Sequence, residues 1–146
     1  MGDISKDIQS KFPSEKVKAF INIKYTANWI HSKENEFFKP FGISPQQFNI
    51  LRILKGAGKA IKVQQIKDRM IERAPNATRL MDKLCAKQLI ERIPCPEDRR
   101  VVHIAITDNG LQLLAKIEEN KDGMNLLSNL STEEANILSD LLDKIR

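Results

Sequence analysis

The feature that most constrains the fold of this chain is a change in the spacing of its apolar residues near residue 89. Before that point they recur every three or four positions, as on one face of a helix, and after it they alternate, as in a strand. The two alternating stretches, 89–93 and 101–106, flank a segment, 94–100, that holds two prolines and four charged residues. The pattern predicts several helices followed by a two-stranded β-hairpin with a stiff, charged tip.

The first long helix is predicted from a start signal at Pro13-Ser14, where Ser14 is suited to cap the helix. The polar residues before it show no sustained period and are expected to fray. Along the helix, apolar side chains recur at spacings of three and four: they are Val17, Phe20, Ile21, Tyr25 and Trp29. We expect the helix to run to about Ser32, with a break in the chain at Phe41-Gly42.

The second helix begins at the clearest start signal in the sequence. Ser44 is an N-cap residue, Pro45 suits the first helical position, and Gln47 completes a capping box. The glycines of the Gly56-Ala57-Gly58 segment are expected to end the helix. Its apolar face consists of Phe48, Leu51 and Leu54.

A third and a fourth helix follow in close succession. A short extended piece at residues 60–61 leads into the third helix, whose inward side chains are Val63, Ile66 and Met70. After a turn at residues 72–74, Pro75 is expected at the first position of the fourth helix. The 3.6-residue period predicts a buried face formed by Ala77, Leu80, Met81 and Leu84. The opposite face presents polar and charged side chains, namely Asn76, Thr78, Arg79, Asp82 and Lys83.

Two more helices are predicted after the hairpin. Thr107 is suited to cap the first of them, and Gly123 is expected to kink or end it. Ser131 begins the second with another capping box. Both carry an apolar stripe, formed by Leu111, Leu114 and Ile117 in the first and by Ala135, Leu138, Leu141, Leu142 and Ile145 in the second.

The order of these elements predicts a mainly α fold with a small β-hairpin wing, in a single domain spanning residues 1–146. Within it, residues 44–107 are predicted to form a winged helix-turn-helix lobe. The helices on either side, at 13–38 and 108–146, are too apolar on one face to stand alone in water. We therefore expect them to form a dimerisation region by packing against a second copy of the chain.

Charge is distributed unevenly along the chain. The 146 residues carry a net charge of +5 at pH 7, which alone favours no class of partner. Residues 44–107 account for +7, because they hold 13 Lys or Arg and 6 Asp or Glu, whereas the rest of the chain has a balance of −2. Positive charge concentrated on a helix-turn-helix lobe is typical of a module that binds a polyanion such as double-stranded DNA.

The exposed face of the fourth helix supplies side chains suited to the major groove. Asn pairs with adenine, Arg with guanine, and Thr contacts the thymine methyl group, while a helix N-terminus attracts a phosphate. The candidates on this helix are Asn76, Thr78, Arg79 and Lys83. At the hairpin tip, an arginine on a narrow turn suits the minor groove, and Asp98 is expected to hold a neighbouring arginine in a fixed rotamer. The tip candidates are Asp98, Arg99 and Arg100, and the sequence leaves open which arginine enters the groove.

These segments resemble the MarR-type (multiple antibiotic resistance) transcriptional regulators. The resemblance is carried by residues 43–48, 78–84 and 89–92, and by Asp98-Arg99-Arg100 followed by a strand and Thr107-Asp108-Asn109-Gly110. It implies a homodimer that is joined through its terminal helices, binds a palindromic operator and often represses nearby genes. It also implies that the candidates named above lie in the major groove and at the wing tip. The chain departs from the family at Gln88, where glycine is common, so a residue with a Cβ must adopt that turn.

Regulators of this kind often respond to small aromatic or anionic ligands, and the first two helices offer candidate lining residues for such an effector. These are Tyr25, Trp29, His31, Phe48 and Arg52. Some relatives sense oxidants through cysteine instead. Cys85 continues the apolar face of the fourth helix and is expected to be a small buried hydrophobe, whereas Cys95 in the wing is expected to be exposed.

Other classes of function find little support in the sequence. It has no Gly-x-Ser-x-Gly, Walker or Cys-x-x-Cys motif, so neither an enzyme nor a metal or cofactor site is expected. It also lacks an apolar segment suited to a signal peptide or a membrane span, which predicts a cytoplasmic protein. The alternative to a DNA-binding regulator is a winged-helix module that binds another protein. Sequence-specific DNA binding with a steep dependence on salt would distinguish the two.

Overall fold

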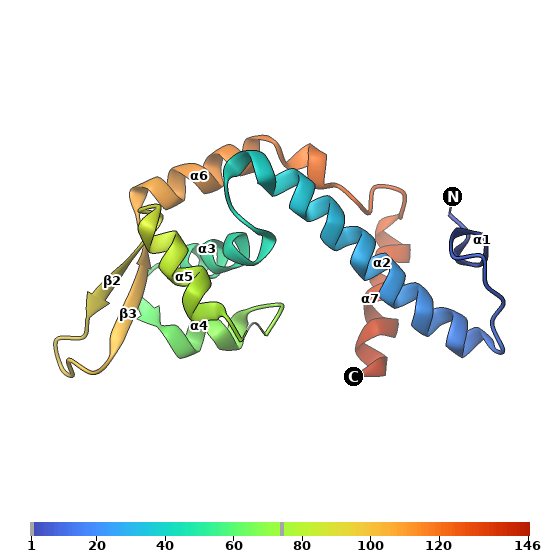
Figure 1. Ribbon diagram of the computed structural model, residues 1–146, viewed down its shortest axis with the longest axis horizontal. Coiled ribbons are helices and arrows are strands. Elements are labelled where there is room, and N and C mark those ends of the chain that lie inside the picture. The colour runs from blue at the N-terminus through green and yellow to red at the C-terminus, as the bar shows by residue number, and fades with distance from the viewer. Residues whose placement is uncertain (1, 74) are drawn as a thin grey trace.

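The computed structural model describes residues 2–73 and 75–146, in which helices predominate and a small sheet carries the wing (Figure 1). The helices are α1 (Ile4–Asp7), α2 (Glu15–Phe38), α3 (Pro45–Ala57), α4 (Val63–Arg69), α5 (Ala77–Ala86), α6 (Asp108–Glu119) and α7 (Thr132–Ile145). The strands are β1 (Ile61–Lys62), β2 (Ile90–Pro94) and β3 (Val102–Ile106). Short 3-10 turns, Lys39–Phe41 and Lys121–Met124, follow α2 and α6. The mainly α fold with a hairpin wing that the sequence predicts is confirmed.

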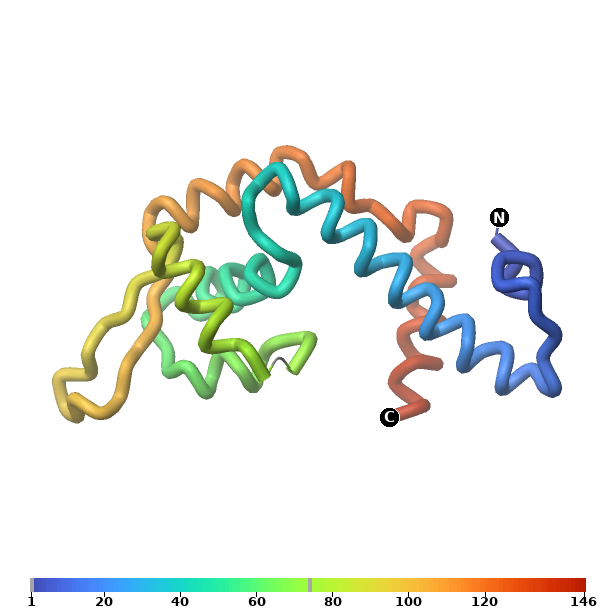
Figure 2. The backbone as a smooth tube through the Cα atoms, in the orientation of Figure 1, coloured from blue at the N-terminus to red at the C-terminus, as the bar shows by residue number. Residues whose placement is uncertain are grey.

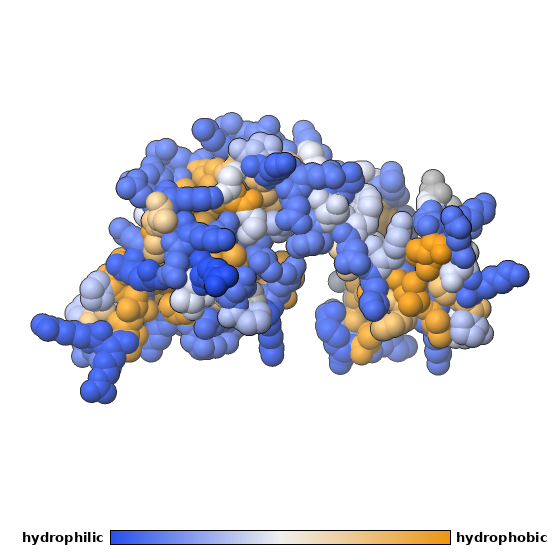
Figure 3. Space-filling model, in the orientation of Figure 1, coloured by the Kyte–Doolittle hydropathy of each residue, from blue (hydrophilic) through white to orange (hydrophobic). Residues whose placement is uncertain are grey.

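The chain forms an arch with two separated ends (Figure 1). At one end, α3, α4, α5 and the sheet make the winged helix-turn-helix lobe. The top of the arch is formed by α6 and the C-terminal part of α2. At the other end lie the N-terminal part of α2, α1, α7 and both chain termini (Figure 2). The space-filling view shows open space between the two ends (Figure 3).

The sheet is antiparallel throughout, with the strand order β1-β3-β2. β2 and β3 form the hairpin predicted from the alternating residues. The short extended piece before the third predicted helix is β1, and it adds to the other side of β3 by pairing Ile61 with Ile104. Because β1 runs directly into α4, the sheet ties the base of the wing to the helix-turn-helix.

The hydrophobic core lies inside the winged lobe, and the faces predicted for α3, α4 and α5 point into it. Its fully buried large side chains are Ile50, Leu51, Leu54, Ile66, Met81, Leu84, Ile90 and Ile104. Each such side chain stabilises the fold by about 1.5–3 kcal/mol relative to an exposed position. Phe48, predicted for the same face, is half-buried and packs on Phe38, with 4.6 Å between the ring centroids.

The predicted helix starts are confirmed by their capping bonds. Ser14, Thr107 and Ser131 each accept a hydrogen bond from the backbone N–H three residues further along, at 3.1–3.3 Å. Ser44 does the same at 3.1 Å, and the Gln47 side chain returns to the Ser44 N–H at 3.0 Å, which completes the predicted capping box. Each cap satisfies backbone groups that the helix itself leaves free.

Three predictions at element ends are wrong. α2 continues past the expected end near Ser32 to Phe38, because Phe38 still packs into the core. The segment expected to fray contains the helical turn α1, in which Ile4 is buried and Asp3 caps the backbone of Ser5 at 3.0 Å. α6 ends at Glu119, before Gly123, which lies in the following 3-10 turn.

The start of the fourth helix also differs from the prediction. α5 begins at Ala77, and Pro75 lies in the turn that precedes it rather than at the first helical position. Asn76 is the N-cap residue, with a non-helical backbone at φ −97° and ψ 20°. The turn predicted at residues 72–74 includes Ala74, which lies outside the described residues.

Two backbone constraints fix the base of the wing against α6. Gln88 has φ of 60°, so a residue with a Cβ does adopt the left-handed turn where glycine is common. Gly110 lies so close to β2 that an added Cβ would stand 2.3 Å from the Leu89 carbonyl oxygen, so only glycine fits there. Thr107 Oγ1 donates to the Gln88 carbonyl at 2.7 Å and bridges the two positions. Within the described part of the chain, no helix is both long and apolar enough to cross a membrane.

Candidate nucleic-acid interface

α5 separates its side chains into a core face and a solvent face. Ala77, Leu80, Met81 and Leu84 are buried, as the sequence predicts. The Leu80 carbonyl accepts a hydrogen bond from Gln47 Nε2 at 3.4 Å, so the capping residue of α3 also holds α5. The side chains predicted for the solvent face are all exposed: Asn76, Thr78, Arg79, Asp82 and Lys83.

Asn76 stands at the N-terminal end of this exposed face. As the N-cap residue it is exposed, and its side chain makes no capping bond to the described part of α5. The amide is therefore available for another hydrogen-bonding partner. The free N–H groups of the first helical turn lie beside it, which makes this end of α5 attractive to an anion.

Asp82, in contrast, is not free. Its Oδ1 accepts a hydrogen bond from Arg92 Nη2 on β2, and this bond raises the pKa of the Arg92 guanidinium above its ordinary value. The pair joins α5 to the wing at the edge of the lobe. The sequence does not predict this pairing, although it places an acidic residue on the solvent face of the helix and an arginine on the next strand.

The wing tip has a different internal geometry from the one expected. Asp98 Oδ1 accepts a hydrogen bond from the Arg100 backbone N–H at 2.9 Å, and the Asp98 carbonyl accepts from Val101 N–H at 3.1 Å. The carboxylate therefore orders the backbone of the tip instead of a guanidinium. The side chains of Arg99 and Arg100 are exposed, and among the described residues neither makes an ion pair with Asp98.

Two further cations lie close to the start of α5 and were not singled out from the sequence. Lys67 of α4 and Arg73 of the following turn border a hollow of about 440 Å³, together with Gln64, Asp68, Met70 and Pro75. In a helix-turn-helix, the first helix crosses the DNA backbone while the second enters the groove. Because Lys67 lies on the first of these helices and Arg73 in the turn that follows it, both residues are candidates for phosphate contacts.

The five predicted effector-lining residues are found in different surroundings. Tyr25 and Trp29 line a hollow closed by the N-terminal segment, together with Gly2, Ile4, Asp7, Asn22 and Thr26. His31 instead faces Glu72, Phe48 packs on Phe38, and Arg52 is exposed on α3.

The two cysteines are both free and both half-buried. Cys85 packs against the edge of the core and lines a hollow with Arg92 and Gln88, so it is less buried than predicted. Cys95 lies at the start of the wing tip and is less exposed than predicted, because its N–H donates to the Val101 carbonyl within the hairpin. The described residues contain no group of three side chains that could hold a metal ion.

Large apolar side chains are exposed at the end of the arch away from the wing. α7 has no buried residue in the described structure, and its Leu141 and Ile145 are 55% and 69% exposed. Phe20 on α2 is 59% exposed. Figure 3 shows apolar atoms gathered on this half of the molecule. The exposed apolar residues of α2 and α7, which we call the terminal apolar surface, are Val17, Phe20, Ile23, Tyr25, Trp29, Ile137, Leu138, Leu141 and Ile145.

A helix-turn-helix followed by a charged hairpin that packs beside it defines the winged helix-turn-helix class of proteins. Residues 43–102 match the MarR family. Over 137 residues the chain is 30% identical to the HTH-type transcriptional regulator MhqR of Bacillus subtilis, an alignment that covers 88% of this chain and 90% of the relative. The chain therefore belongs to the MarR family of transcriptional regulators.

Solved structures of family members share the fold described above. The chain superposes on a MarR transcription factor from Planctomyces limnophilus with a TM-score of 0.70 and 35% identity, covering 91% of this chain and 98% of that one. It superposes on a mutant of MarR from Escherichia coli in complex with operator DNA with a TM-score of 0.79 and 26% identity. The second superposition covers 93% of this chain and 99% of the other. The resemblance inferred from the sequence motifs is confirmed.

Proposed function

We propose that this protein binds a palindromic operator in double-stranded DNA as a homodimer and represses nearby genes. The observation that carries the proposal is the exposed polar face of α5 beside a charged wing tip, in a lobe whose sequence has a balance of +7. The E. coli relative that superposes over 93% of this chain was solved with operator DNA. In this proposal residues 44–107 bind DNA, and 13–38 and 108–146 hold the dimer together.

The exposed side chains divide between two grooves. Asn76, Thr78, Arg79 and Lys83 would enter the major groove, where Arg79 is suited to guanine and Asn76 to adenine. The tip residues Asp98, Arg99 and Arg100 would reach the adjacent minor groove. Since Asp98 bonds to the Arg100 backbone, its role would be to shape the tip, while the two guanidinium groups make the contacts.

The terminal apolar surface supports a homodimer. A helix with no buried residue, such as α7, gains little from folding alone, and exposed apolar patches of this kind mark protein interfaces. The second copy is the natural occupant, because a two-fold dimer presents two α5 helices to the two halves of a palindrome. The balance of −2 outside residues 44–107 leaves little like-charge repulsion between the two copies.

In this proposal, binding of a small aromatic or anionic ligand releases the protein from its operator. The structure offers Tyr25 and Trp29 as the aromatic part of a candidate effector site, where they line the hollow below the N-terminal segment. His31, Phe48 and Arg52 remain candidates for contacts that form in the dimer.

DNA binding is tested by footprinting on the DNA upstream of the protein's own gene, followed by salt titration of the bound fragment. We expect a two-fold symmetric footprint and an affinity that falls steeply with salt, because each neutralised phosphate releases counterions. No binding to any promoter fragment at low salt would instead favour the module that binds another protein.

The dimer is tested by light scattering on Leu141→Lys and on a control, Lys59→Ala, which changes an exposed residue outside the proposed dimerisation region. The first change puts a charge into the terminal apolar surface and is expected to give monomers that bind operator weakly. The control is expected to remain dimeric. Two dimeric variants would contradict the assignment of this surface.

A further inference from the structure

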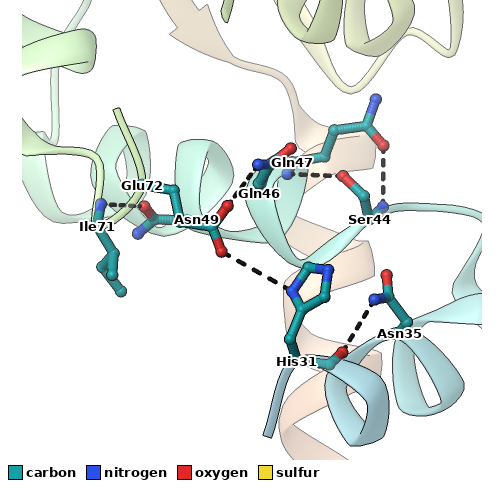
Figure 4. Close-up of polar contacts among 8 residues, drawn as sticks. All are labelled: His31, Asn35, Ser44, Gln46, Gln47, Asn49, Ile71 and Glu72. Atoms are coloured by element: carbon teal, nitrogen blue, oxygen red, sulfur yellow. Dashed lines mark hydrogen bonds and ion pairs between the residues drawn. The ribbon is translucent and has the colours of Figure 1, made fainter. Parts of the chain in front are cut away.

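Three polar contacts tie the turn before α5 to the neighbouring helices (Figure 4). Glu72 Oε1 lies 3.8 Å from His31 Nδ1 on α2, and Glu72 Oε2 accepts a hydrogen bond from Gln46 Nε2 on α3 at 2.6 Å. Asn49 Oδ1 on α3 accepts the Ile71 backbone N–H at 3.0 Å. We call these contacts the turn clamp. It joins three elements that are far apart in the sequence.

The clamp holds the turn between α4 and α5. α4 ends at Arg69 and α5 starts at Ala77, so the described residues between them, 70–73 and 75–76, lead into the N-terminal end of α5. On the core side this segment is anchored by the buried side chain of Met70. On the outer side it is held by the clamp, because Ile71 is itself 87% exposed and contributes no packing.

Glu72 lies in a favourable place for a carboxylate. Gln46 belongs to the first turn of α3, where the free backbone N–H groups and the helix dipole favour a negative charge. The reciprocal bonds between Ser44 and Gln47 fix that turn (Figure 4). The carboxylate therefore meets a rigid donor, and its hydrogen bond to Gln46 is short and charge-assisted.

Two carboxylates lie near His31. Glu72 faces it from the turn, and Glu34 stands three positions further along α2. α3 contributes the neutral amides of Gln46 and Asn49, and together with Glu34 and Glu72 they border a small hollow of about 60 Å³.

We propose that Glu72 is a positioning residue for operator recognition. By its contact with His31 and its hydrogen bond from Gln46 it holds the turn before α5 and links α2, which belongs to the proposed dimerisation region, to the helix proposed to read DNA. The inference rests on the function proposed above. A turn that is already fixed loses less conformational freedom on binding. Operator affinity is therefore higher with the clamp than it would be if α5 were loosely held.

The clamp is expected to act on sequence-specific binding. Sequence-independent binding reports on the charges that meet the phosphates, so the ratio of operator to random-sequence affinity isolates the effect of the clamp.

The test compares full-length variants on the footprinted operator and on a scrambled duplex of equal length. Glu72→Ala removes both contacts and is expected to weaken operator binding by about fivefold to tenfold, the range of an exposed ion pair with one charge-assisted hydrogen bond. Affinity for the scrambled duplex should change much less. Glu72→Gln retains an oxygen for Gln46 and should lose only part of the affinity. His31→Gln should lower the ratio of operator to scrambled affinity by as much as Glu72→Gln does, and the double variant should add nothing.

Two matched controls separate the clamp from general charge effects. Glu36→Gln makes the same change on α2 at an exposed carboxylate that pairs with Lys33 at 3.2 Å, and it should leave the ratio unchanged. His103→Gln removes the other histidine, which lies in β3 opposite Lys62, and it should leave the ratio unchanged.

Hydrogen exchange without DNA provides a second readout. Glu72→Ala should speed exchange of the Ile71 amide and of the first turn of α5, but not of the core of α3. Unchanged exchange, or wild-type operator preference in both Glu72 variants, would overturn the role of the clamp. A wild-type protein without operator preference would overturn the function itself, and the exchange data would then still decide whether Glu72 holds the turn.

Discussion

Arg92 on β2 donates a hydrogen bond through Nη2 to Asp82 Oδ1 on α5, so the wing and the helix beside it are joined by an ion pair outside the core. The two side chains are 44% and 55% exposed. An ion pair this exposed contributes only about 0–1 kcal/mol to folding. Its larger effect is geometric, because it fixes the angle between two elements that would have to contact one DNA site together.

Replacing Arg92 with Gln is therefore expected to have a small effect on stability and a measurable one on DNA binding. The free energy of unfolding in urea should fall by no more than about 1 kcal/mol. Operator affinity should fall by up to about fivefold, the same free energy, since the wing then has to be ordered during binding. Asp82→Asn should behave alike, and the double variant should lose no more than either single one. Additive losses in the double variant would show that the two residues act separately.

Loss of arginine is expected to affect DNA binding differently on α5 and at the wing tip. Arg79→Ala should reduce discrimination at one base pair in each half-site by about 1–3 kcal/mol, because a base contact is lost. Ala at both Arg99 and Arg100 should weaken binding more evenly across sequences. Binding to an operator library measures both effects. Unchanged selectivity in Arg79→Ala would place α5 outside the major groove.

Gly110 provides a test of the junction between the wing and α6. Ala at this position would bring a methyl group to 2.3 Å from the Leu89 carbonyl and 2.6 Å from the Ile106 side chain, so backbone has to move. We expect a loss of about 1–3 kcal/mol in the free energy of unfolding, as for other overpacked sites. Gly56→Ala is the matched control, since a Cβ there meets nothing within 4 Å and α3 should gain up to about 1 kcal/mol. Equal stability of the two variants would contradict this geometry.

The sequence predicts those parts of the fold that depend on local signals. The capping boxes at Ser44 and Ser131, the apolar face of α5 and the hairpin all follow from residues close together in the chain. The end of α2 does not, because Phe38 extends the helix through packing against α3, a contact between distant residues.

The candidate site divides in the same way. The exposed face of α5 was predictable from its 3.6-residue period. The Arg92–Asp82 pair and the Glu72 contacts were not, since each joins residues that only the folded topology brings together. The bond from the Arg100 backbone to Asp98 was missed for another reason: an aspartate next to two arginines suggests an ion pair, but in a tight turn it commonly bonds to the backbone two residues on.

Glu34 is expected to reduce stability at neutral pH. Burial is the main cause that raises the pKa of its carboxyl above the ordinary value of 4.5, the Glu72 charge adds to the rise, and His31 opposes it. The folded protein therefore binds this proton more tightly than the unfolded chain, so the group favours folding at acid pH and that contribution is lost as the pH rises through the folded pKa. Glu34→Gln should raise Tm at pH 7, and the gain should shrink as the pH falls through the raised pKa of the folded state and be absent below about 4.5. Thermal unfolding between pH 7 and about pH 4 measures the difference in Tm between the variant and the wild type. Glu36→Gln, which changes an exposed carboxylate, is a control that should show no such gain. A Tm difference that does not depend on pH would mean that the Glu34 charge is not its cause.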